Sequence, residues 1–124
     1  MISFDYSAIL RNLLIGDTTL NGLIGNRVFP IVADAGTNFP FIVYRRSSYD
    51  KSYGNKDDWD NKFSVELAIL ADTYRFSIEV LENVIRVLDN YDNGSISIEV
   101  TNTFEDFSDD TYIQKVNLDI KYNK

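Results

Sequence analysis

The sequence predicts a single α+β domain over residues 1–124, with a mostly antiparallel sheet of about five strands and two main helices packed on one face. Three observations favour this class. The length of 124 residues suits one domain with its own core. Residues 63–71 alternate between buried-type and polar side chains and lead directly into a long amphipathic helix. Residues 112–122 alternate in the same way, which gives the order helix, three strands, helix, two strands.

The N-terminal part is expected to form two helical segments. The first starts with Asp5 or Ser3 as its N-cap and ends with Gly16 as its C′ residue. The second is a short turn that starts at Asp17 and stops at Gly25. The apolar stripe of the first segment consists of Tyr6, Ile9, Leu10, Leu13 and Leu14. This stripe predicts that the first helix packs on the sheet.

Two strands and a long loop follow. Residues 27–32 form a strand that belongs at an edge or beside a bulge, because Pro30 cannot donate to a ladder. Residues 41–46 form the second strand. Residues 47–61 are irregular and far longer than an ordinary hairpin connection, so they predict a loop.

Aromatic residues in this loop are candidates for contact with a partner. Tyr49, Tyr53 and Trp59 carry amphipathic rings of the kind that anchor interfaces. Long loops are also where binding sites are commonly found. The alternative is that Trp59 packs back onto the sheet and the rest of the loop is solvated.

Residues 73–90 predict the main helix, capped by the side chain of Asp72 or Thr73. Glu82 and Arg86 have the spacing of a stabilising ion pair on one helix face. The core-facing stripe is expected to consist of Tyr74, Ile78, Leu81, Ile85 and Leu88.

The apolar arc of this helix is wider than one sheet requires. Further apolar positions extend it to roughly 200°, whereas a helix on one sheet needs only a little over ~100°. These positions are Phe76, Val80, Val84, Val87 and Tyr91. A second helix or a neighbouring subunit is needed to cover the excess. Phe76, Val80 and Val87 are therefore candidates for a subunit or partner interface.

The C-terminal part predicts a hairpin. Residues 92–95 form a turn around an Asn-Gly pair, and a strand starts at Ile96. Its alternation slips near Asn102, which indicates a bulge or a twist. Residues 108–110 turn the chain into the last strand, residues 112–122.

Catalytic and metal-binding chemistry is not indicated. The sequence has no histidine and no cysteine, which excludes imidazole bases, thiol nucleophiles and the usual zinc sites. The acidic pairs Asp57/Asp58 and Asp109/Asp110 are adjacent in expected turns, where carboxylates are commonly only solvated. We therefore expect no catalytic residue, no metal and no cofactor.

Charge is unevenly distributed along the chain. The formal net charge is −7, with +1 in residues 1–49 and −8 in residues 50–124. Such a balance argues against non-specific binding of nucleic acid. No stretch is apolar over the ~20 residues that span a bilayer, and the start lacks the pattern of a secretion signal.

Four segments carry a family resemblance. They are the first helix with residues 20–30 after it, the Pro-aromatic-aliphatic strand at 39–44, the strand and helix at 65–89, and the terminal hairpin at 104–122. In these segments the sequence resembles the tail terminator, or tail-completion, proteins of long-tailed bacteriophages and prophages. The long polar stretch at 47–61 is where divergence from that family is expected.

The resemblance implies an α+β subunit that closes into a ring, typically a hexamer. The ring caps the growing tail tube, stops its polymerisation and offers the head-tail joining surface. The implied partners are further copies of the chain, the tail tube protein and a head-completion or neck protein. The implied location is the tail or neck of the virion, with assembly in the host cytoplasm, and no membrane is involved.

DNA would pass through such a ring without specific binding. Asp57, Asp58, Asp109 and Asp110 are hypothesised to face the lumen and reduce DNA adhesion there. A solvated acidic surface that aids solubility is the simpler interpretation of the same residues.

Two other functions remain open. The chain could be another neck component, a head-closure or connector protein, which shares size, acidity and ring formation. It could also be an acidic binding module, such as a DNA mimic that inhibits a nuclease, which would be a monomer or dimer. An enzyme is the least favoured interpretation.

Overall fold

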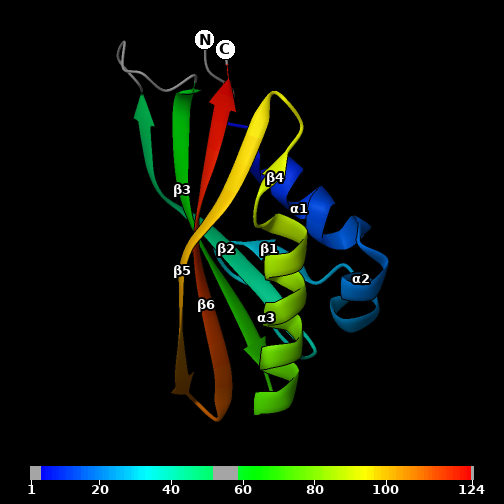
Figure 1. Cartoon of the computed structure of the whole chain (residues 1–124). Coiled ribbons are helices and arrows are strands. Elements are labelled where there is room, and N and C mark those ends of the chain that lie inside the picture. The colour runs from blue at the N-terminus through cyan, green and yellow to red at the C-terminus, as the bar shows by residue number, and fades with distance from the viewer. Residues whose placement is uncertain (1–3, 52–58, 124) are drawn as a thin grey trace.

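The computed structural model describes residues 4–51 and 59–123, with only the backbone for residues 59, 60 and 123. The described residues form an α+β fold with three helices on one face of a six-stranded sheet (Figure 1). The helices are α1 (Tyr6–Gly16), α2 (Thr18–Ile24) and α3 (Tyr74–Leu88). The strands are β1 (Val28–Pro30), β2 (Phe41–Lys51), β3 (Trp59–Ala71), β4 (Tyr91–Asp92), β5 (Ile96–Ser108) and β6 (Thr111–Asn123).

The strand order across the sheet is β1-β2-β3-β6-β5-β4. Every neighbouring pair is antiparallel except β1 and β2, which are parallel. The predicted class is confirmed, although the sheet has six strands and not about five. The strand that sequence reasoning missed is the two-residue β4, and β1 lies at an edge as Pro30 predicts.

The core lies between the helices and the inner face of the sheet. Phe63 is fully buried, with four aromatic neighbours within 5.3 Å between ring centroids. These neighbours are Phe4, Tyr6, Tyr49 and Tyr122. The helices contribute Leu10, Leu14, Leu20, Ile24, Val80, Val84 and Leu88. Among the described residues, no helix is long and apolar enough to cross a membrane.

The ends of the first two helices follow the predictions only in part. Asp17 caps α2 by accepting a hydrogen bond from the backbone N–H of Leu20 at 3.0 Å, and Gly25 ends α2 with φ 59°. Gly16 is not a C′ residue, because it is the last residue of α1 and the chain becomes extended at Asp17. Asp5 occupies the N-cap of α1 without capping it, since its carboxylate instead accepts a hydrogen bond from Tyr122 at 3.0 Å.

The loop predicted at residues 47–61 is wrong for its two ends. β2 runs to Lys51 and β3 starts at Trp59, so the pair of strands extends well beyond Arg46. The register shifts between Arg46 and Ser48, and the Ser47 hydroxyl donates to the Ser64 carbonyl at 3.0 Å. A bulge moves the following side chains to the other face, which is why the alternation in the sequence stops at Arg46.

A second bulge lies where the sequence predicts it. The register of β5 on β6 shifts between Val100 and Asn102. The Thr101 hydroxyl donates to the Asn117 carbonyl at 3.0 Å, as Ser47 does to Ser64. Both outer long strands are thus divided by a bulge that carries a hydroxyl residue.

The predicted core stripe of α3 is confirmed at Leu88, and Leu81 packs partly against the core, but the rest of the stripe is misplaced. The buried line consists of Ser77, Val80, Val84 and Leu88, while Tyr74 is 49% exposed. Ser77 lies in the core because its hydroxyl accepts a hydrogen bond from Gln114 at 3.2 Å and donates one to the Tyr74 carbonyl at 2.7 Å. A stripe built from apolar residues alone omits Ser77. The predicted stripe is therefore rotated around the helix relative to the buried line. The cap is confirmed, with Thr73 accepting from the N–H of Phe76 at 3.1 Å.

Candidate functional site

Surface features carry the functional argument. Among residues 4–51 and 59–123, no group of three or more His, Cys, Asp or Glu side chains could hold a metal ion. The exposed large apolar residues of the described chain are Phe4, Ile31, Val32, Phe39, Tyr74, Phe76, Phe104 and Phe107. A subunit that assembles with others needs accessible apolar groups of this kind.

An aromatic and acidic hollow lies between the N-terminal end of α3 and the β5–β6 hairpin. Glu105 is at its centre, where one carboxylate oxygen accepts hydrogen bonds from the Tyr74 hydroxyl and from Gln114, both at 3.0 Å. The Tyr112 ring lies 4.8 Å from that of Phe107 and 6.0 Å from that of Tyr74, between centroids. The hydrogen bond to Glu105, followed by its negative charge, raises the pKa of Tyr74. The hollow therefore places the Glu105 carboxylate beside exposed rings.

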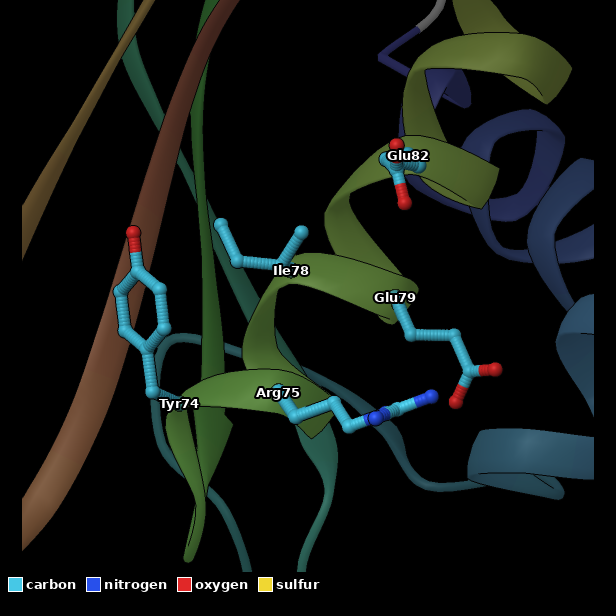
Figure 2. Close-up of a pocket in the computed structure, with 5 residues that line it drawn as sticks. All are labelled: Tyr74, Arg75, Ile78, Glu79 and Glu82. Carbon is cyan, nitrogen blue, oxygen red and sulfur yellow. The ribbon is translucent and has the colours of Figure 1, made fainter.

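The outer face of α3 bears a second, shallow hollow. Figure 2 shows Tyr74 directed toward the sheet, while Arg75 and Glu79 extend away from it on the outer side of the helix. Ile78 and Glu82 complete the lining. This face mixes apolar and charged groups and is not the apolar surface expected from the width of the helical arc.

The predicted interface residues of α3 have three different environments. Phe76 is 41% exposed and accessible to a partner. Val80 is fully buried, so it belongs to the core and not to an accessible surface. Val87 packs partly against that core. The excess arc is thus largely covered within the chain, by the sheet and by the neighbouring helices.

The aromatic residues predicted in the 47–61 stretch do not form one group in the described residues. Tyr49 lies in β2, where its ring packs 5.0 Å from that of Phe63 and its hydroxyl donates to Asn61. Tyr53 lies outside the described residues. Trp59 begins β3, with its backbone opposite Asn123.

The structure describes only two of the four predicted acidic residues. Asp109 and Asp110 form the two-residue turn between β5 and β6, with φ of 52° and 56°. Asp57 and Asp58 lie outside the described residues. Their flanking residues, Lys51 and Trp59, lie at the other end of the sheet from this turn (Figure 1).

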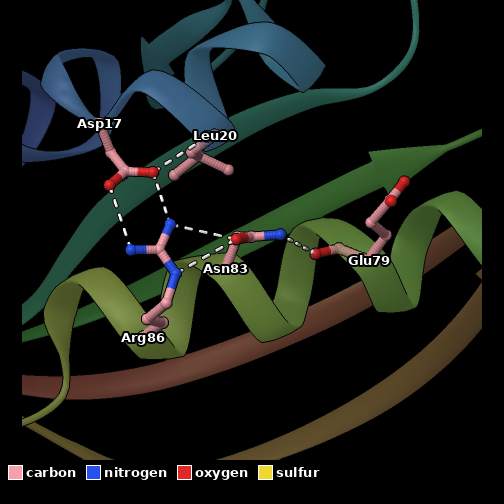
Figure 3. Close-up of polar contacts among 5 residues, drawn as sticks. All are labelled: Asp17, Leu20, Glu79, Asn83 and Arg86. Atoms are coloured by element: carbon pink, nitrogen blue, oxygen red, sulfur yellow. Dashed lines mark hydrogen bonds and ion pairs between the residues drawn. The ribbon is translucent and has the colours of Figure 1, made fainter.

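Arg86 has a structural task that differs from the predicted one. Figure 3 shows its guanidinium paired with both carboxylate oxygens of Asp17, at 3.2 and 2.6 Å, and with the side-chain oxygen of Asn83. The expected partner Glu82 is not among these contacts. The bond from Arg86, followed by that from the Leu20 N–H, lowers the pKa of Asp17. This pair joins α2 to α3 and supports the fold.

The β1 edge of the sheet is closed to further strands. The Val28 N–H donates to the Asn26 carbonyl at 2.9 Å, and the Val28 carbonyl accepts from the Arg11 side chain at 3.2 Å. Pro30 has no N–H, and its carbonyl accepts from Val32 at 2.7 Å. These contacts occupy the backbone groups that could pair with another chain.

Two longer stretches of edge are open in the described structure. β1 covers β2 only at Ile42–Tyr44, so residues 45–51 have no strand on their outer side. β4 covers β5 only at Ser97 and Ile98, so residues 101–108 have none either. We name these stretches the β2 arm and the β5 arm. Sequence reasoning missed both arms, although the slip in alternation near Asn102 indicated the bulge at which the β5 arm begins.

The alternation of an antiparallel ladder identifies the backbone groups at each open edge. In the β5 arm, Thr103, Glu105 and Phe107 face outward, and the Phe107 N–H accordingly donates to the Asp106 side chain at 2.8 Å. In the β2 arm the corresponding residues include Arg46 and Tyr49. All residues of the β5 arm are exposed.

Comparison with known proteins finds similarity in fold. No protein-family model and no curated protein sequence matches the chain. A chain of the solved structure described as "Virion of native gene transfer agent (GTA) particle" superposes with a TM-score of 0.72 at 10% sequence identity. The match covers 93% of this chain and 92% of that one. The likeness therefore extends over nearly the whole of both folds.

Proposed function

We propose that this protein is a structural subunit of a phage-type virion that caps the tail tube as a ring. In this role it ends polymerisation of the tube and forms the surface to which the head is joined. The observation that carries the proposal is the shared fold with a chain of a gene transfer agent virion, which covers 93% of this chain. The segments that resemble tail terminator proteins point in the same direction.

The surface of the molecule suits assembly. Phe104 and Phe107 are 45% and 53% exposed on the β5 arm, and Phe107 lines the acidic hollow. Aromatic side chains are enriched in protein interfaces. The proposed partners are further copies, the tail tube protein and a neck protein, and the proposed ring is a hexamer of 14.2 kDa subunits.

The test is polymerisation of the tail tube protein from the same genome, with and without this chain. We expect tubes that stop growing and carry density for this protein at one end, seen by electron microscopy. The control is the same chain in heat-unfolded form. Tubes of unchanged length at saturating protein, with nothing bound at their ends, would contradict the proposal.

A second candidate is a head-closure or connector protein. The same fold similarity favours it, because that similarity is to a chain of a whole virion particle. Pull-down separates the two, since a tail cap retains tube protein and a connector retains portal or adaptor protein. Retention of a nuclease alone would instead indicate the acidic mimic.

We further propose that Asp109 and Asp110, together with Asp57 and Asp58, face the lumen and weaken DNA adhesion. Asparagine tolerates the positive φ of the turn, so Asp→Asn changes remove charge without disturbing its backbone. We expect slower DNA ejection from particles with these changes. Ejection at the original rate would exclude this role for the four carboxylates.

A further inference from the structure

The two arms are complementary in charge. The β2 arm contains Arg45, Arg46, Asp50 and Lys51, whereas the β5 arm contains Glu105 and Asp106 and leads into Asp109 and Asp110. Pairing β5 with β5 would bring carboxylates together, and pairing β2 with β2 would bring guanidinium groups together. Only the β2 arm of one copy against the β5 arm of another brings together arms of opposite net charge, because Arg45, Arg46 and Lys51 outnumber Asp50 on the β2 arm.

We propose that copies of this chain join through their sheet edges, with the β2 arm of one copy adding to the β5 arm of the next. The occupant of each open edge is therefore a second copy. This inference deepens the proposed function, because it assigns the surfaces that would build the ring. A contact between two different surfaces is head-to-tail, and it generates a ring when the rotation closes.

Strand direction agrees with this arrangement. β2, β3, β6 and β5 follow one another through three antiparallel pairings, so β2 and β5 point in opposite directions. When a second sheet continues the first with its helices on the same face, its β2 lies antiparallel to β5. The intermolecular ladder then has the same pattern as the ladders inside each copy.

The limits of the arms define one register. On β2, coverage by β1 ends at Tyr44, so Arg46 is the first outward residue of the arm. On β5, the turn begins after Ser108, so Phe107 is the last outward residue. A ladder filled from this end places Arg46 opposite Phe107. The bulge at Ser47 then brings Tyr49 opposite Glu105 and Ser48 opposite Asp106.

This register brings opposite charges together on the face that carries Arg46 and Glu105. Arg46, which already lies 5.0 Å from the Phe4 ring centroid, would gain the Phe107 ring and lie diagonal to Glu105. The Tyr49 hydroxyl would approach the same carboxylate. The hollow beside Glu105 would then be closed by the neighbouring copy.

Cysteine cross-linking tests the register in a chain that has no cysteine of its own. Ser48 and Asp106 would form a non-hydrogen-bonded pair, with Cα atoms about 4.5 Å apart, within the range of a disulfide. We expect Ser48→Cys with Asp106→Cys to give a ladder of covalent multimers on oxidation. Each single variant alone should give none, because the two surfaces differ.

The control for random collisions is Ser48→Cys with Glu82→Cys, which has the same number of thiols with one on α3. Equal multimers from this control would overturn the proposal. A covalent dimer from Ser48→Cys alone would do the same, since it would indicate a two-fold contact.

Charge reversal tests the energetics without new covalent bonds. We expect Glu105→Arg or Arg46→Glu to weaken self-association at least about tenfold, and the double exchange to restore part of it. Multi-angle light scattering across concentrations provides the mass. Glu82→Arg and Arg75→Glu on α3 are the matched controls. A monomer at every concentration, or a larger loss from the α3 variants, would overturn the proposal.

The outcome is separable from that of the proposed function. A ring that cross-links at residues 48 and 106 but leaves tube length unchanged supports the interface and contradicts tail capping. A chain that caps tubes but never cross-links at these residues contradicts the interface and leaves capping intact.

Discussion

The two halves of the outer strands β2 and β5 differ in environment although each strand is continuous. Ile42 and Ile98 lie in the covered halves and are fully buried under the helices. The arms beyond the bulges are mostly exposed, and they carry charged and aromatic side chains. One strand can therefore serve the core along one part of its length and a partner along the other. The bulges at Ser47 and Thr101 separate the two tasks.

The largest effect is expected from truncation in the covered half of β5. Ile98→Ala should lower the free energy of unfolding by about 2–5 kcal/mol, because it removes buried methylene groups and leaves a cavity. Phe104→Ala, in the arm of the same strand, should cost less than about 1 kcal/mol, since Phe104 is half exposed. Urea denaturation of both variants provides the measurement. Similar losses would contradict the division of the strand.

The bulge itself should contribute a smaller amount. Thr101→Val removes the hydroxyl that donates to the Asn117 carbonyl but keeps a β-branched side chain. We expect a loss of about 0.5–1.5 kcal/mol, the usual value of one hydrogen bond. Thr103→Val, two residues along the arm, is the control, because no hydrogen bond of its hydroxyl is part of the described structure. An equal loss from the control would remove the special role of the bulge.

Substitution in the turn at the end of the β5 arm should raise the stability of the protein. Asp109 and Asp110 both have positive φ, where Asn-Gly is preferred in a two-residue hairpin turn. Asp109→Asn with Asp110→Gly should raise the free energy of unfolding by up to about 1 kcal/mol. Thermal unfolding measures it, and Glu79→Gln with Glu82→Gln on α3 controls for the loss of two negative charges. An unchanged melting temperature would show that the turn does not limit the stability of the arm.

The smallest effect on stability is expected from the ion pair between Asp17 and Arg86, which joins α2 to α3. The pKa of Asp17 is lowered below its ordinary value of 3.8 by Arg86 and the Leu20 N–H. Its contribution is therefore fully present above that value and is lost as the pH falls through the lower pKa of the folded state. Asp17→Asn should be less stable than the original chain at pH 7, and the difference should shrink below pH 3.8. A constant difference in urea midpoint would contradict this.

The central strands β3 and β6 are the part of the sheet that the sequence predicts well. Strands 63–71 and 112–122 follow a two-residue period because one face of each is buried in the core. The cap at Thr73 and the stop at Gly25 were also evident, since each depends on local side-chain or backbone chemistry. Local rules are sufficient where a residue's partner is a near neighbour in sequence.

The remaining features depend on distant partners. Ser77 is buried because Gln114 reaches it from another strand, and Arg86 turns to Asp17 instead of the nearby Glu82. The arms were missed for a related reason, because no core face imposes a period on them. An arm begins where the neighbouring strand, β1 or β4, stops pairing, and only the register of the sheet shows where that is.

The positions of the two arms have a consequence for any closed assembly built from them. They lie at opposite ends of the sheet, because β1 covers the beginning of β2 and the hairpin turn limits the end of β5 (Figure 1). Copies joined through them are displaced along the strand direction. A cylinder accommodates such a shear only when its strands are inclined to the axis. The length of β1 would therefore set the pitch of the wall, and with it the diameter of the central bore.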